Sequence, residues 1–201
     1  IRDRIGVACS GWLLSRHIPH SPAPDPTLKV NWNVFSETWN ILQLTRRDRT
    51  IFLSILGISW FWCYGSLFLS QFPNYSKEVI GGNEQIVTLF LTCFSFGIGI
   101  GSLLCERLSG HKVEMGLVPL GAIGLTLFAI DLFFATPAIK GEHAIGALAF
   151  LQTFAGWRIA ADLFLLGLFG GFFIVPLYAL IQFRSEAIYR SRIIAGNNII
   201  N

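Results

Sequence analysis

Charged side chains are scarce in this sequence. Asp, Glu, Lys and Arg together make up only 13% of the 201 residues, whereas a soluble domain carries about 25%. Hydrophobic residues account for 53% and include eighteen Phe, and the mean hydropathy is +0.57. Because so few charges cannot cover a water-soluble globule of this size, the composition argues against a soluble helical domain and favours a membrane protein.

Motifs for metal, redox and catalytic chemistry are also missing. The four cysteines are far apart in the sequence: Cys9, Cys63, Cys93 and Cys105. None belongs to a CxxC or Cys/His pattern, so the sequence predicts neither a metal site nor a disulfide framework. No nucleophile lies in a pattern with a base. We therefore expect no cofactor and no enzyme activity in this chain.

Two further functions are disfavoured. The net charge of +3 is too small to indicate a nucleic-acid partner. The run "GIGIGSL" lacks the G-x-G-x-x-G spacing of a dinucleotide loop and follows no strand. We interpret Gly97 and Gly101, four residues apart, as a close packing face between helices.

Long apolar runs are the main feature that is present. A spanning helix needs about 20 mainly apolar residues, and four stretches qualify: 51–72, 86–105, 113–135 and 159–183. The sequence thus predicts an all-α, polytopic membrane helical bundle. Asp131 lies near the outer end of the third stretch, where we expect it to reach the interface. We expect Asp162 to form a local ion pair with Arg158, four residues earlier.

The segments outside these runs have different compositions. Residues 1–14 contain an apolar run too short to span, which we interpret as the truncated end of a preceding membrane helix. Residues 15–50 contain the Pro-rich "HIPHSPAPDP" (17–26), which cannot lie inside a helix, and are interpreted as a central cytoplasmic linker. Residues 184–201 are interpreted as a cytoplasmic turn and the start of a further membrane helix. We therefore read the chain as an internal piece of a longer polypeptide.

The second half of the linker, "FSETWNILQLTRRDR", predicts a short amphipathic helix. Ser36 is the expected N-cap, with Glu37 in the first turn. Three apolar side chains are placed where they would lie along the membrane surface: Phe35, Trp39 and Leu42.

The basic residues are distributed unevenly among the loops. Ten lie in the loops before the first span, between the second and third, and after the fourth: Arg16, Lys29, Arg46, Arg47, Arg49, Arg107, Lys112, Arg184, Arg190 and Arg192. The opposite loops hold three: Lys77, Lys140 and Arg158. Since cytoplasmic loops are enriched in Lys and Arg, we expect the stretch "GSLLCERLSGHKVE" (101–114) to be a cytoplasmic turn.

This turn resembles the signature turn of the major facilitator superfamily of transporters, which occurs once in each half of those proteins. There its acid and base latch neighbouring helix ends on the cytoplasmic side. The matching residues are Gly101, Glu106, Arg107, Gly110 and Lys112. The spacing departs by an extra residue or two, and His111 stands where Arg is common. Charge-assisted bonds can make such a latch; the alternative is a solvated turn that only fixes orientation.

Longer segments resemble the lysophospholipid transporter branch of that superfamily. They are "LGISWFWCYGSLFLSQFP", "GSLLCERLSGHKVEMGLVPLGAIGLTLF" and "GFFIVPLYALIQFRSEAIYRSRIIAGNNIIN". The resemblance covers nearly everything from Val30 onward and implies helices seven to ten of a twelve-helix fold, hence a partial major facilitator fold. It also implies that the protein moves lysophospholipid across the bacterial inner membrane for re-acylation, with membrane lipid and a fused or associated acyltransferase as partners. The alternatives are a drug or small-solute exporter of the same superfamily and a membrane anchor for a fused acyltransferase.

The resemblance also directs attention to side chains in the first and fourth spans. The first helix of each half lines the central cavity in this family, and an amphiphilic substrate needs apolar walls with a few polar groups. The substrate-binding candidates are Trp60, Trp62, Tyr64 and Gln182. The alternative for the aromatic residues is core packing or lipid contact.

The fourth span also contains candidate hinge residues: Gly170, Gly171 and Pro176. Pro176 has no N–H to donate to the carbonyl of Phe172, so a kink is expected there. A static bundle is the alternative, because Gly and Pro are frequent in spanning helices.

Overall fold

The computed structural model describes residues 2–16, 32–110, 112–136 and 145–201. The chain divides into two compact units, Ile1–Asn31 and Trp32–Asn201. The first unit contains helix α1 (Arg2–Ser15). Most of the Pro-rich linker and His111 lie outside the described residues.

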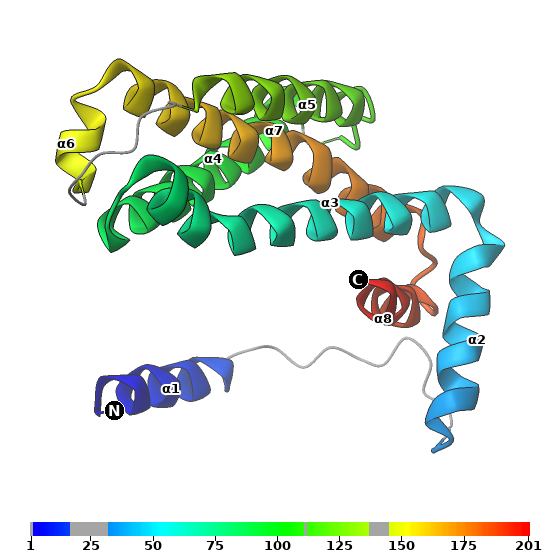
Figure 1. Ribbon diagram of the computed structural model, residues 1–201. Helices are drawn as coiled ribbons and strands as arrows, with labels where there is room; N and C mark the ends of the chain where they lie inside the picture. Colours follow the sequence, from blue (N-terminus) through cyan, green and yellow to red (C-terminus); the bar gives the residue numbers. More distant parts are fainter. Residues whose placement is uncertain (1, 17–31, 111, 137–144) are drawn as a thin grey trace. The chain divides into compact units, whose positions relative to one another are not determined.

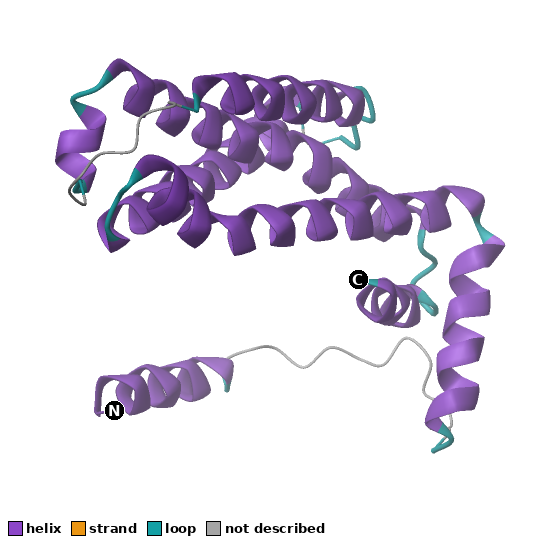
Figure 2. Ribbon diagram, viewed as in Figure 1, coloured by secondary structure: helices purple, strands orange, loops and turns teal. Residues whose placement is uncertain are grey.

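Helices form the second unit, and no strand occurs among the described residues (Figure 2). The elements are α2 (Val34–Arg47), α3 (Arg49–Asn74), the π-helical segment η1 (Tyr75–Ile80), α4 (Glu84–Leu108), α5 (Leu117–Ala135), α6 (Ala147–Leu151), α7 (Phe154–Arg184) and α8 (Arg190–Ile200). Four helical stretches are long and apolar enough to cross a membrane: Arg49–Ile80, Glu84–Leu108, Leu117–Ala135 and Phe154–Arg184. The expectation of an all-α bundle with membrane-spanning helices is confirmed.

The ends of these helices differ from the ends of the predicted apolar runs. Helix continues beyond a run in some places, and turn-forming residues stop it earlier in others. The first helix continues through Pro73, and η1 extends it to Ile80. The third begins at Leu117, later than predicted, because Gly110 ends α4 with a φ of 56° and a turn follows. The fourth begins at Phe154, since the Thr153 hydroxyl caps it by accepting a bond from the Gly156 N–H at 3.0 Å.

Helix α7 is the central helix of the second unit and packs against α3, α4 and α5 (Figure 1). In its most apolar stretch 61% of the residues are buried, compared with 17% in α5. The remaining helices therefore turn much of their apolar surface outward, as expected where lipid is the surrounding solvent.

The contact between α4 and α7 is made by glycines on both helices. A Cβ atom added to Gly97 would lie 2.1 Å from the carbonyl oxygen of Phe164, so the two backbones touch. Gly101 on α4, and Gly167 and Gly171 on α7, are equally closed to a side chain. This confirms the interpretation of Gly97 and Gly101 as a close packing face.

The four long helices alternate in direction. Helix α4 runs parallel to α7 along the glycine contact, and α3 runs antiparallel to it, because Asp48 at the start of α3 meets Arg184 at the end of α7. Helix α5 is also antiparallel, since Asp131 near its end meets Arg158 near the start of α7. We call the end with Asp48, residues 109–110 and 112–116, and Arg184 the turn end, and the opposite end the far end. Eight of the ten basic residues, those from Arg46 onward, belong to the second unit and lie at or beside the turn end.

Helix α2 packs against α8. Asn33 caps it by accepting a bond from the Ser36 N–H at 3.1 Å, so the prediction of Ser36 as the N-cap is wrong. Thr45 is fully buried, and Glu37 forms an ion pair with Arg192 of α8 at 3.5 Å. On the outward side, two of the predicted surface side chains are exposed and one is partly buried: Phe35, Trp39 and Leu42.

Candidate functional site

An open cavity of about 1020 Å³, in which Trp60 and Trp62 are half-exposed, lies between α3, α7 and α8. Its lining residues are Ser59, Trp60, Trp62, Cys63, Ser66, Tyr178, Asn198, Ile200 and Asn201. The walls are two indole rings and short side chains, and hydroxyl and amide groups are placed among them. Apolar walls with a few oriented polar groups are the usual composition of a small-molecule site.

Two hydrogen bonds fix the polar groups of this cavity. The Trp62 Nε1–H donates to the Tyr178 hydroxyl oxygen at 3.2 Å and joins α3 to α7. The Ser59 hydroxyl lies 2.6 Å from the Asn201 Oδ1 and joins α3 to the end of α8. Since the Tyr178 oxygen accepts from the indole, its own O–H remains able to donate to a bound polar group.

The structure brings together only part of the predicted substrate set. Trp60 and Trp62 line the large cavity. Tyr64 stacks on Trp60 with ring centroids 5.3 Å apart, but its hydroxyl donates to the Leu125 carbonyl of α5 at 3.4 Å, and it lines a separate cavity of about 480 Å³. Gln182 is exposed and is not among the residues that line either cavity.

Sequence reasoning missed Tyr178. It lies four residues before Gln182 and therefore on the same face of α7, one turn closer to the middle of the helix. That spacing was a usable signal, because a tyrosine combines an apolar ring with a hydroxyl. No sequence signal indicated that Asn198 and Asn201 line the cavity, because their place there depends on how α8 packs.

The charged turn lies beside the Pro176 region of α7. Glu106 and Lys112 line a pocket of about 290 Å³ together with Val175 and Pro176. Two predicted latch residues and one predicted hinge residue thus meet at the turn end, although they are far apart in the sequence. Of the remaining latch candidates, Arg107 is exposed, Gly110 shapes the turn and Gly101 belongs to the glycine contact.

The hinge candidates have packing roles in this structure. A Cβ on Gly171 would lie 2.7 Å from the Ser102 backbone nitrogen, and one on Gly170 would lie 3.0 Å from the Phe61 ring. Helix α7 is unbroken through Pro176. Both glycines therefore allow neighbours to approach closely, and bending at this helix stays a prediction.

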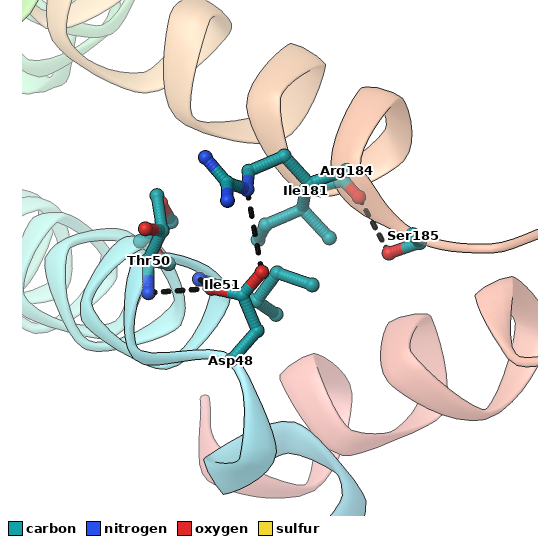
Figure 3. Close-up of polar contacts among 7 residues, drawn as sticks. Asp48, Thr50, Ile51, Ile181, Arg184 and Ser185 are labelled. Atoms are coloured by element: carbon teal, nitrogen blue, oxygen red, sulfur yellow. Dashed lines mark hydrogen bonds and ion pairs between the residues drawn. The ribbon is translucent and has the colours of Figure 1, made fainter.

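An ionic corner at the turn end was not predicted (Figure 3). The Asp48 carboxylate accepts bonds from the backbone N–H groups of Thr50 at 2.8 Å and Ile51 at 3.3 Å, and from Arg184 Nε at 3.3 Å. Burial raises the pKa of Asp48, but these hydrogen bonds and the Arg184 charge together lower it below its usual value. An Asp directly before an apolar run is a sequence signal for an N-cap, but its pairing with Arg184 requires the tertiary fold.

The expected pairing of Arg158 with Asp162 is not the one that forms. Arg158 reaches from α7 to Asp131 of α5, with Nε 3.0 Å from Oδ2 and a second bond between its terminal nitrogen and Oδ1. The half-exposed Asp131 therefore joins two helices at the far end. Asp162 is 3% exposed, and its Oδ2 has no hydrogen-bond partner.

The fold and these sites define the chain as a polytopic α-helical membrane protein with an amphiphilic cavity between α3, α7 and α8. Comparisons of the chain with protein-family models, with curated proteins and with solved structures give no match.

Proposed function

We propose that this protein is a secondary transporter that moves lysophospholipid across the bacterial inner membrane for re-acylation. The observation that carries the proposal is the cavity lined by Trp60, Trp62 and Tyr178. It offers both of the surfaces that a single-chain lipid requires. The indole rings provide an apolar wall for the acyl chain, and the Tyr178 hydroxyl and the asparagine amides provide hydrogen bonds for a polar head group.

The arrangement of the turn end supports movement between two states. Ion pairs at helix ends are bonds that one arrangement of a bundle makes and another breaks. Asp48–Arg184 joins the start of α3 to the end of α7, and Glu37–Arg192 joins α2 to α8. Because α3, α7 and α8 also line the cavity, opening these pairs would widen it on one side. Alternating access of this kind is the general mechanism of secondary transporters.

The transport proposal is tested with the intact protein reconstituted in lipid vesicles. Labelled lysophospholipid is added on one side, and its appearance in the other leaflet or lumen is compared with that in protein-free vesicles. We expect protein-dependent movement of lysophospholipid and little movement of a dye or a diacyl lipid. Movement of dyes with none of lysophospholipid would instead favour an exporter. No movement of either, with acyltransferase activity retained, would favour a membrane anchor.

A further inference from the structure

At the far end of the bundle, two carboxylates lie close to one guanidinium: Asp131, Asp162 and Arg158. Arg158 is engaged by Asp131 through two parallel bonds, the geometry that satisfies a guanidinium–carboxylate pair best. Asp162 lies one turn further along α7 and is 3% exposed. Its Oδ2 has no hydrogen-bond partner. The cation that would balance Asp162 is thus already used by another carboxylate.

The other polar groups near Asp162 do not compensate for this. The Tyr75 hydroxyl of η1 is 2.8 Å from the Thr136 hydroxyl at the end of α5, and both partners are neutral. Lys77 of η1 and Glu84 of α4 are exposed and form an ion pair with each other at 3.9 Å. Helix α6, with the sequence "ALAFL", has no titratable side chain. Among the described residues, Asp131 and Arg158 are therefore the charged groups that act on Asp162 directly.

An ionised Asp162 would be a buried charge beside a second carboxylate, Asp131, and the Arg158 guanidinium would be shared between the two. Burial of an ionised carboxylate is strongly unfavourable unless it is paired and hydrogen-bonded, and such groups bind a proton instead. A protonated carboxyl is neutral, and burying it in the same place costs much less. The geometry thus favours a proton on Asp162 as long as Arg158 remains with Asp131.

We propose that Asp162 is a proton-binding site whose occupancy decides which carboxylate Arg158 binds. In the protonated state the O–H bond of Asp162 is intact, and Arg158 joins α7 to α5 through Asp131. When that O–H bond breaks and the proton passes to water, Asp162 becomes the second anion. Residues four apart lie on the same helix face, so Arg158 can turn to Asp162 within α7. The bond between α5 and α7 is then lost.

This inference does not depend on the proposed substrate, because it concerns only proton binding and the contact between two helices. A sodium ion is the other ligand that two carboxylates suggest, but Arg158 already supplies a positive charge between them. Cation sites of this kind also use several oxygen ligands. Among the described residues no group of three or more His, Cys, Asp or Glu side chains is placed to hold a metal ion.

Infrared spectroscopy of the intact protein in lipid nanodiscs tests the proposal directly. The C=O stretching band of a buried protonated carboxyl is followed while the pH is raised. We expect the band to be present in mildly acidic buffer, to disappear as the pH is raised, and to be missing at every pH in Asp162→Asn. The control Glu84→Gln changes an exposed carboxylate at the same end and should leave the band unchanged. Absence of the band in the wild type, or its persistence in Asp162→Asn, would overturn the proposal.

A second variant keeps the test informative if Asp162→Asn does not fold. Asp131→Asn removes the neighbouring carboxylate and releases Arg158 to pair with Asp162, so the band should appear only at a lower pH than in the wild type. A band that is unaffected by Asp131→Asn would contradict the partner exchange. If the band changed with sodium concentration at fixed pH, Asp162 would belong to a cation site and not to a proton site.

The partner exchange also has a structural readout. Ile130 of α5 and Trp157 of α7 are exposed neighbours of the paired residues, and spin labels at these positions in a cysteine-free background report the separation of the two helices. We expect the separation to increase in alkali in the otherwise unchanged protein and to stay short at every pH with Asp162→Asn. A separation that is independent of pH in both would refute the exchange.

Discussion

Asp48 lies between α2 and α3 and acts on three elements through one carboxylate. Its Oδ1 caps α3 by accepting bonds from Thr50 and Ile51, and its Oδ2 accepts a bond from Arg184 of α7. Backbone N–H groups in the first turn of a helix have no partner within the helix. The cap therefore contributes more to stability than the half-exposed ion pair, which contributes at most about 1 kcal/mol.

Two substitutions at this position separate the cap from the ion pair. Asp48→Ala removes both and should lower the free energy of unfolding by about 1 kcal/mol, within the range for lost N-caps of about 0.5–2 kcal/mol. Asp48→Asn keeps a capping oxygen and loses only the charge, so its cost should be smaller. Unfolding in detergent measures both values. Equal costs for the two variants would show that the ion pair, not the cap, is the main contribution.

The stability contributed by Asp48 should depend on pH. Its pKa is lower in the folded protein than the usual value of 3.8, so the folded state favours the ionised form. The contribution is therefore complete above the unfolded-state pKa and is lost as the pH falls through the folded-state pKa. In Asp48→Asn this part of the acid destabilisation should be missing. Parallel acid titrations of the two proteins would disprove this assignment.

At the scale of helices, the contact between α4 and α7 depends on positions where no side chain fits. Gly97→Ala would place a Cβ 2.1 Å from a backbone oxygen, which cannot move aside as a flexible side chain can. Overpacking of this kind costs about 1–3 kcal/mol. We expect Gly97→Ala to lower the midpoint of thermal unfolding.

Gly99 is the matched control for this prediction. It lies on the same helix, two residues away, and nothing is within 4 Å of a Cβ placed there. Gly99→Ala should leave stability unchanged or raise it, because Ala favours a helix over Gly by about 1 kcal/mol. Equal stability of the two variants would contradict the close backbone contact between α4 and α7 at Gly97.

The turn between α4 and α5 gives a prediction about conformational change. Glu106 is exposed and lines the pocket beside Pro176. A latch bond to an exposed carboxylate would contribute up to about 1 kcal/mol, or roughly fivefold in a two-state balance. Glu106→Gln should keep insertion normal and change transport per inserted molecule by up to that factor. Cysteine accessibility on the two sides of the cavity provides a second measure. If Glu106→Gln matched the wild type in both measurements, the turn would be only a solvated connector.

The helices were predictable from sequence, whereas most of the contacts between them were not. Apolar runs located all four long helices, and the spacing of Gly97 and Gly101 located a packing face. The helix ends shifted where the chain is helical without being apolar, as at 73–80. The pairing of Arg158 was misjudged because a partner four residues away is visible in the sequence, while Asp131 on another helix is not. Tyr178 could have been found from its position one turn before Gln182, but its bond with Trp62 depends on the packing of α3 against α7.

For the whole molecule, the orientation in the membrane follows from the second unit, whose alternating helices place the basic residues from Arg46 onward at or beside the turn end. We therefore predict that the turn end faces the cytoplasm. In a cysteine-free background, Ser109→Cys should react with an impermeant thiol reagent only after intact cells are opened. Glu84→Cys, at the far end, should react in intact cells. The reverse pattern would invert the orientation.

The central claim is that the cavity between α3, α7 and α8 carries lysophospholipid. The most direct test is the rate of lysophospholipid movement per inserted molecule in vesicles, compared between Trp62→Ala and Trp157→Ala. Trp62 lines the cavity and bonds to Tyr178, whereas Trp157 is an exposed tryptophan that is not among the cavity residues. We predict that Trp62→Ala loses most of the transport while Trp157→Ala retains it at similar levels of insertion. Equal rates in the two variants would contradict the claim.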